Sequence, residues 1–156
     1  MHQIYLRIAN KYSIMGNYDE AIKYYNYSII MKPDDAVIYY YLGLTYFKKR
    51  AIDLAIKSYK KAIALNDRFA SVYSDLGIAY YSLGDYDKAM DYFTKAVNID
   101  PDDPLVITGF SKIYINNGKA DLARENLIKD KESGLNTGEA RHVKLAWAFK
   151  NILLAQ

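Results

Sequence analysis

A repeated pattern organises the chain and is most complete between Ala70 and Asp103. These residues read ASVYSDLGIAYYSLGDYDKAMDYFTKAVNIDPDD. The same positions return 34 residues earlier, and several return again one interval before that. The recurring residues are Leu42-Gly43 and Leu76-Gly77; Tyr12, Tyr46 and Tyr80; and Ala21, Ala55 and Ala89. A fixed period of this size indicates stacked supersecondary units.

Each unit is predicted to contain two helices. In the copy quoted above, apolar residues recur at helical spacing until Gly84-Asp85 interrupts them. A second helix is expected to begin near Tyr86 and to end before Pro101, because proline cannot continue a helix. We expect Gly77 and Ala89 where the two antiparallel helices cross, since larger side chains would force the backbones apart.

These residues resemble the tetratricopeptide repeat, whose 34-residue pattern is an aromatic, Leu-Gly, Tyr, Ala, an aromatic, Ala and Pro. The unit at 70–103 matches throughout, with Tyr73, Leu76, Gly77, Tyr80, Ala89, Phe93, Ala96 and Pro101. The units at 2–35 and 36–69 match in register, whereas the unit at 104–137 is degenerate and 138–156 is expected to form a last helix. The resemblance implies a single all-α domain over 1–156. That domain is a right-handed α-solenoid of stacked antiparallel helix pairs, with about four repeats plus a C-terminal helix.

Composition narrows the class of protein further. The chain contains no cysteine, so disulfides and thiolate metal sites are excluded. Its longest apolar runs fall well short of the roughly 20 residues that cross a bilayer, and its first residues lack the layout of a secretion signal. We therefore expect no membrane insertion and a cytoplasmic location, either as a whole protein or as a fragment of a larger one.

The sequence contains few residues in combinations that could support catalysis. Its histidines are His2 and His142, and no nucleophile with a base, metal-ligand cluster or glycine-rich phosphate loop is recognisable. The acidic pairs Asp34-Asp35 and Asp102-Asp103 stand in turns beside prolines, where Asp supports helix starts. Three glycines share one repeat position between helices and are predicted turn residues: Gly16, Gly84 and Gly118. The sequence thus predicts no catalytic residue, no metal and no cofactor, and so a non-enzymatic protein.

Charge is segregated between neighbouring units. Residues 36–69 hold 7 Lys or Arg and 2 Asp or Glu, whereas residues 70–103 hold 2 and 7. These fields could attract each other or steer a partner, or they could simply be solvated helix faces that differ. The basic residues are Lys48-Lys49-Arg50, Lys57, Lys60 and Lys61. Nucleic acid is not an expected partner, because these residues divide between a turn and a convex helix and an acidic unit follows.

The resemblance also implies a binding face. In this family the first helices of the units line a concave face that holds extended or helical peptides. The implied groove residues here are Leu6, Asn10, Tyr40, Tyr41, Leu44, Phe47, Ser74, Asp75, Ile78, Tyr81, Lys112 and Ile115. Of the 17 tyrosines, Tyr40, Tyr41 and Tyr81 fall in this set without occupying an aromatic position of the repeat. They are expected to provide binding surface, with packing against a neighbouring helix as the alternative.

A well-known subgroup of the family grips the C-terminal carboxylate of chaperone peptides with Lys, Asn and Arg at five positions. The aligned residues here are Leu6, Asn10, Tyr41, Ser71 and Asp75, of which only Asn10 matches. We therefore expect no carboxylate clamp.

Two functions follow as hypotheses. The first is an adaptor that binds a peptide or helix of a partner protein in an apolar, tyrosine-lined groove. The second is a self-assembling scaffold that forms homo-oligomers through the ends of the stack. The second hypothesis rests on the unusually apolar last segment, whose predicted oligomer or cap contacts are Trp147, Phe149 and Leu153.

Overall fold

The computed structural model describes residues 1–100, 103, 105–106, 109 and 112–113. Within this part of the chain the regular elements are all helices, and no strand occurs. They are α1 (His2–Ile14), α2 (Tyr18–Met31), α3 (Ala36–Lys48), α4 (Ile52–Leu65), α5 (Ala70–Ser82) and α6 (Tyr86–Ile99). One helix pair thus lies within each of the units predicted at 2–35, 36–69 and 70–103. The pair α5–α6 has its break where Gly84-Asp85 predicted it.

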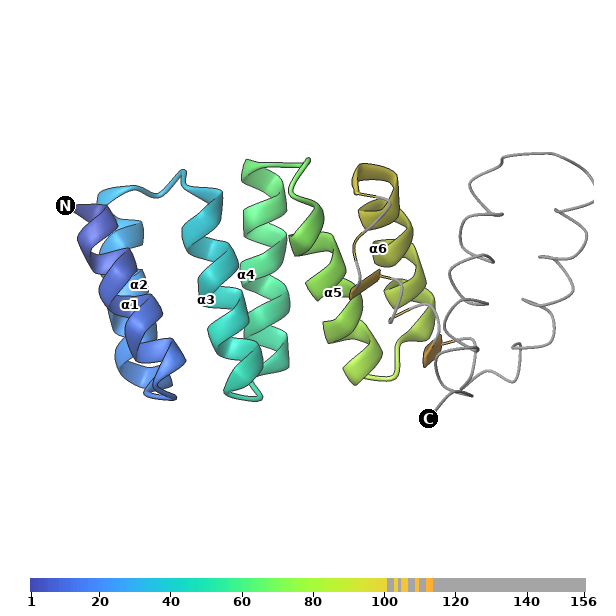
Figure 1. The fold of residues 1–156 in the computed structure, drawn as a ribbon, viewed down its shortest axis with the longest axis horizontal. Coiled ribbons are helices and arrows are strands. Elements are labelled where there is room, and N and C mark those ends of the chain that lie inside the picture. The colour runs from blue at the N-terminus through green and yellow to red at the C-terminus, as the bar shows by residue number, and fades with distance from the viewer. Residues whose placement is uncertain (101–102, 104, 107–108, 110–111, 114–156) are drawn as a thin grey trace, which may run out of the picture.

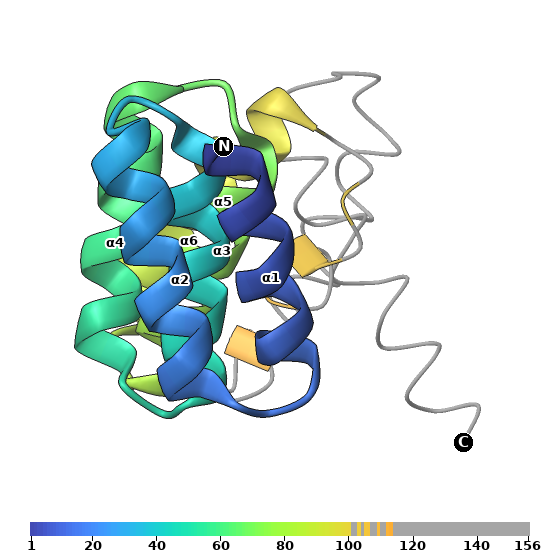
Figure 2. The same ribbon diagram turned by 90° about the vertical axis from the view of Figure 1, so that its left-hand side faces the viewer.

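The helices form two layers. Consecutive pairs stand side by side along the molecule (Figure 1). The end-on view in Figure 2 separates α1, α3 and α5 from α2, α4 and α6. Contacts join α1 to α3 and α3 to α5 within the first layer. The arrangement is an all-α solenoid that presents its first helices on one side.

Left-handed backbone closes each turn between paired helices. Gly16 and Gly84 have φ of 80° and 77°, as the shared glycine position predicted. The middle unit carries Arg50 at this position, and it adopts the same conformation with φ of 67°. The prediction is thus confirmed for two glycines, while Gly118 lies outside the described residues.

Carboxylates begin two helices, as expected. Asp35 accepts a hydrogen bond from the backbone N–H of Val37 at 3.1 Å and caps α3. Asp103 likewise accepts from the N–H of Leu105 at 2.9 Å, and the backbone is helical at the described residues from 105 to 113. One member of each acidic pair therefore has a helix-start role.

A glycine on each of two first helices makes room for an aromatic ring on the second helix. A Cβ added to Gly77 would lie 2.5 Å from a ring carbon of Phe93, and one added to Gly43 would lie 2.5 Å from the ring of Tyr59. Both rings are buried. The close approach expected at Gly77 is thus present, but the neighbour it accommodates is an aromatic ring rather than backbone.

Several predictions concern residues that the structure does not describe. These are the second helix of the degenerate fourth unit, the last helix at 138–156 and the contacts assigned to Trp147, Phe149 and Leu153. Within the described residues, no helix has the length and apolar character needed to span a bilayer.

Candidate functional site

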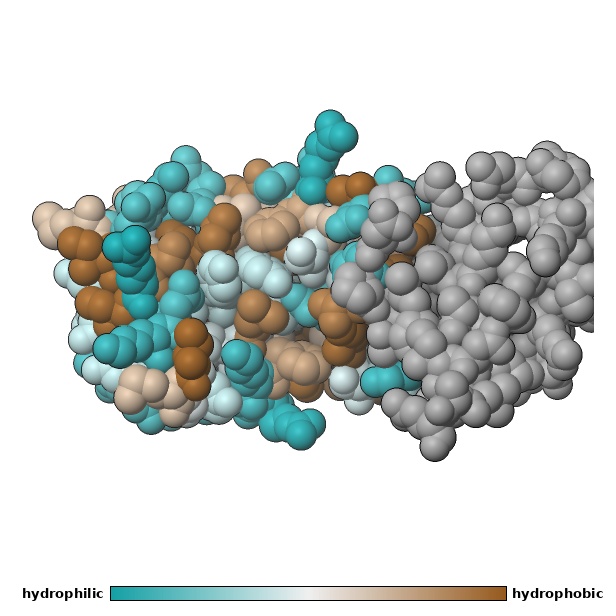
Figure 3. Space-filling view, viewed as in Figure 1, coloured by the Kyte–Doolittle hydropathy of each residue, from teal (hydrophilic) through white to brown (hydrophobic). Residues whose placement is uncertain are grey.

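The layer of first helices presents a broad apolar surface, which we call the α1–α3–α5 face. This face points toward the viewer in Figure 1, and Figure 3 shows apolar side chains at several places on it, with polar side chains between them. Its exposed apolar residues include Val37, Tyr41 and Leu105, at 40%, 36% and 43% exposure. Half-buried side chains pack behind them on the core, namely Tyr40, Leu44, Phe47, Ile78 and Tyr81. Six of the predicted apolar groove residues therefore belong to α3 and α5, namely Tyr40, Tyr41, Leu44, Phe47, Ile78 and Tyr81.

The adjacent tyrosines of α3 have different environments. The Tyr40 ring lies 4.9 Å from Phe69 and 6.3 Å from Tyr59, measured between centroids, and is half-buried. Tyr41 packs one side against Tyr40 at 5.3 Å and remains exposed. Packing against neighbours thus accounts for much of the Tyr40 surface, whereas the Tyr41 ring remains exposed on the face.

Asp75 is a half-buried acidic residue of α5 that lies beside Tyr40 of α3. Burial raises the pKa of its carboxyl to about 6, although hydrogen bonding from the Tyr40 hydroxyl opposes the rise and the nearby Asp103 adds to it. Burial also raises the pKa of Tyr40, and the neighbouring Asp75 charge contributes. Oxygen Oδ2 of Asp75 is buried and has no hydrogen-bond partner among the described residues. A carboxyl group that ionises near pH 6 thus lies between α3 and α5.

Ser74 does not line the groove as predicted. Its side chain is 0% exposed and its hydroxyl donates to Asp103. Asp103 holds the same repeat position as Phe69, which packs on Tyr40 one unit earlier. The pair Ser74–Asp103 is therefore a polar replacement for the pair Tyr40–Phe69, and it belongs to the interior.

The first unit contributes less to this face than predicted. Asn10 is half-buried, and its amide oxygen accepts a hydrogen bond of 2.6 Å from the Tyr25 hydroxyl. Leu6 packs on the small core around Ala9 and Tyr25. Both residues support the α1–α2 pair, so the one residue that matches the carboxylate clamp already has its oxygen engaged.

A pocket of about 140 Å³ opens where α5 meets the described residues of the fourth unit. It is lined by Ile78, Tyr81, Phe93, Leu105, Gly109 and Lys112. The structure thus brings together three predicted site residues, Ile78, Tyr81 and Lys112, while Ile115 lies outside the described residues. Phe93 was assigned only to the core. The sequence contained one signal for this pocket. Gly109 has no side chain at the repeat position where the other units carry Arg7, Tyr41 and Asp75.

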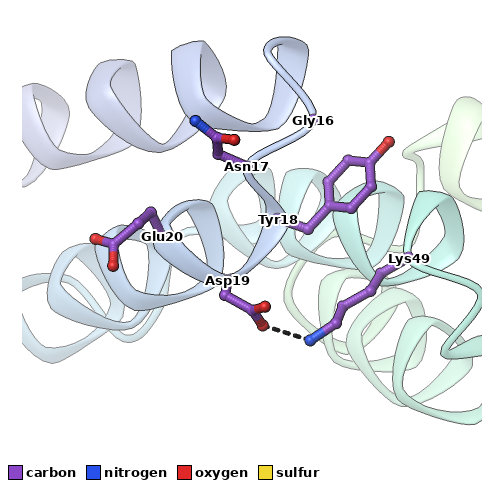
Figure 4. Close-up of a pocket in the computed structure, with 6 residues that line it drawn as sticks. All are labelled: Gly16, Asn17, Tyr18, Asp19, Glu20 and Lys49. Atoms are coloured by element: carbon purple, nitrogen blue, oxygen red, sulfur yellow. Dashed lines mark hydrogen bonds and ion pairs between the residues drawn. The ribbon is translucent and has the colours of Figure 1, made fainter.

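A second hollow lies between the first two units, away from the apolar face. The hollow is lined by Gly16, Asn17, Tyr18, Asp19, Glu20 and Lys49. Figure 4 shows Asp19 pointing toward Lys49, with which it forms an ion pair, while Asn17 and Glu20 point away from it. The hollow is polar, and these two opposite charges satisfy each other. The ion pair thus links the start of α2 to the end of α3.

Two further lysines of the second unit lie over tyrosine rings of the stack. The Lys60 ammonium lies 5.6 Å from the centroid of the Tyr80 ring, and Lys61 lies 5.9 Å from that of Tyr39. Such contacts are cation–π interactions. Over the described residues, no three His, Asp or Glu side chains gather in a way that could hold a metal ion.

Comparison with known protein families shows to which family the chain belongs. A family model described as "Tetratricopeptide repeat" matches residues 70–103, and one described as "TPR repeat" matches 9–49 and 51–84. Together they cover more than half of the chain. The chain belongs to the tetratricopeptide repeat (TPR) family. None of the curated proteins compared with it matches.

Solved TPR structures share this fold. A structure titled "Crystal structure of MamA" is 23% identical with a TM-score of 0.75, and the match covers 99% of this chain and 81% of that one. The first TPR domain of Spaghetti (RPAP3), bound to the HSP90 peptide SRMEEVD, is 24% identical with a TM-score of 0.72 and coverages of 75% and 93%. The second TPR domain of human RPAP3, in complex with the HSP70 peptide SGPTIEEVD, is 22% identical with a TM-score of 0.67 and coverages of 72% and 98%.

Proposed function

We propose that this TPR chain is a protein-interaction adaptor that holds a peptide or helix of a partner protein in a groove on the α1–α3–α5 face. The observation that carries the proposal is the set of exposed apolar side chains on this face, with Val37 and Tyr41 on α3 and Leu105 in the fourth unit. Exposed apolar patches of this kind mark interaction sites. Peptide-bound TPR domains of the same fold support it by analogy.

The partner differs from the peptides in those two complexes. Both peptides end in the acidic sequence EEVD. At the three clamp positions where that subgroup carries Lys or Arg, this chain has Leu6, Ser71 and Asp75. A C-terminal carboxylate would lie beside Asp75, so we expect an internal, largely apolar segment to bind.

The test is binding of peptides selected from a random library displayed on phage. Recovered peptides are synthesised and titrated by calorimetry against the wild type and the double variant Val37→Ser/Tyr41→Ser. The matched control is Tyr27→Ser/Ile30→Ser on α2, whose parent residues are 42% and 78% exposed. We expect the α3 pair to weaken binding at least about tenfold, since two apolar contacts are lost, and the α2 pair to leave it unchanged. Equal effects of both pairs would refute the groove.

A second candidate function, self-assembly, rests on the exposed end of the first unit. Ile4 is 60% exposed, whereas the residues at its repeat position in the later units are 0% exposed. Those residues are Ile38, Val72 and Val106. The surface that each later unit buries against its predecessor is thus open on α1 and could receive a helix of another copy.

Light scattering on the purified chain separates the two candidates. Self-assembly predicts a mass that rises with concentration and returns to that of a monomer in Ile4→Glu. A strict monomer at high concentration removes this candidate and leaves the adaptor proposal intact.

A further inference from the structure

We propose that the pocket between α5 and the fourth unit is the anchor site of the groove. It takes one aliphatic or aromatic side chain of a partner segment that carries Asp or Glu beside this anchor, and Lys112 meets the acidic residue. The inference rests on the proposed groove function and specifies the chemistry of its ligand.

Gly109 creates the pocket. Its Cβ, if present, would lie 2.2 Å from the Phe93 ring, which also packs on Gly77. The two glycines therefore hold Phe93 between them, and the missing side chain of Gly109 leaves Phe93 as part of the pocket wall. At the equivalent position one unit earlier, the side chain of Asp75 is present. The site is thus specific to this junction rather than common to every unit.

The size of the pocket defines its occupant. A dry cavity of roughly 150 Å³ lined by Leu, Ile and Phe accommodates benzene, and this pocket measures about 140 Å³. Cofactors and drug-sized ligands need roughly 300 Å³ or more. One side chain of the size of Leu, Met or Phe fits, and a free cofactor does not.

The chemistry of the lining selects the same occupant. Ile78, Phe93 and Leu105 supply apolar surface, and Tyr81 adds a ring that also packs on Tyr86 at 5.4 Å. Among the described lining residues only Lys112 is charged. It is exposed, and no described carboxylate forms an ion pair with it. An apolar anchor in the pocket would therefore place its neighbouring residues close to a cation. Charge complementarity at such a rim directs partner choice and association rate.

A charge-swap selection tests the proposal. The same random peptide library is selected in parallel on the wild type, on Lys112→Glu and on the control Lys57→Glu, which changes an exposed lysine of α4. We expect peptides from the wild type and the control to share an apolar residue flanked by Asp or Glu, and those from Lys112→Glu to carry Lys or Arg there. Wild-type peptides should bind Lys112→Glu about fivefold or more weakly. An unchanged motif overturns the proposal.

Filling the pocket provides the second arm. Ile78→Phe should weaken binding of wild-type peptides at least about tenfold, with helical content checked by circular dichroism. If this variant does not fold, the surface change at Lys112 decides alone.

The outcomes separate the two proposals. Peptides that lose binding in Val37→Ser/Tyr41→Ser but keep their motif and affinity in Lys112→Glu support the groove and refute the anchor pocket. Peptides that also bind Val37→Ser/Tyr41→Ser as tightly as the wild type refute both proposals.

Discussion

At the scale of single residues, Arg50 carries a conformational cost that the other units avoid. Its φ of 67° lies in the left-handed region, where an L-residue with a Cβ loses roughly 1–2 kcal/mol. A glycine at this position would avoid this cost, but glycine itself loses about 0.5–1 kcal/mol more in conformational entropy on folding. We predict that Arg50→Gly raises the free energy of unfolding by about 1 kcal/mol, measured by urea denaturation.

The reverse change provides the control. Gly84 shares this repeat position with φ of 77°, and a Cβ added there would meet nothing within 4 Å. Gly84→Ala should therefore lower the free energy of unfolding by about 1 kcal/mol for conformational reasons alone. Effects of the same sign at the two positions would contradict this explanation.

The raised pKa of Asp75 predicts that the free energy of unfolding depends on pH. Its pKa is raised in the folded state from 3.8 to about 6, so the folded protein favours the protonated carboxyl. The stability it contributes is fully present below about pH 4 and is lost as the pH rises through 6. Asp75→Asn lacks this ionisable group. Between pH 4 and pH 7 the unfolding free energy of the wild type should therefore fall by about 2–3 kcal/mol relative to that of Asp75→Asn. A difference that does not change with pH would exclude a raised pKa.

Individual residues also show where sequence reasoning stops. The glycine turns and the capping aspartates were predictable because each has a local cause. Ser74 was not, because its burial depends on Asp103, which lies 29 positions away in sequence. Arg50 gave no conformational signal of its own, and only its alignment with Gly16 and Gly84 could have revealed it.

At the scale of helices, ring-over-glycine packing joins α5 to α6. Gly77→Ala would place a methyl group 2.5 Å from the Phe93 ring. Overpacking costs about 1–3 kcal/mol, partly offset by about 1 kcal/mol from the better helix propensity of Ala. We predict a net loss of about 1–2 kcal/mol in unfolding free energy. Ser82→Ala, on the exposed side of α5, should change it by less than about 0.5 kcal/mol.

A double-mutant cycle identifies the cause. In a Phe93→Leu background the smaller side chain relieves the clash, so Gly77→Ala should cost less than it does in the wild type. Additive effects would place the strain elsewhere.

Helix boundaries themselves could be predicted from the repeat period, because the same breaks recur at Gly16 and Gly84. The identity of the ring against each glycine was not readable, since it depends on packing between two helices.

At the scale of the whole molecule, the repeat predicted the stacking and the face that the first helices share. It did not predict which side chains on that face remain accessible. Tyr40 and Tyr41 are neighbours in sequence, yet Phe69 and Tyr59 cover much of the first while the second is exposed. The pocket at Gly109 likewise depends on Phe93 from α6, which no single-unit pattern places there.

The most direct test of groove binding is a map of backbone amide chemical shifts as a selected peptide is titrated into the isotope-labelled wild type. We predict that the largest changes cluster on α3 and α5, around Val37, Tyr41 and Ile78, and that α2 and α4 change little. Changes concentrated on α2, α4 or the exposed end at Ile4, with α3 and α5 silent, would contradict it.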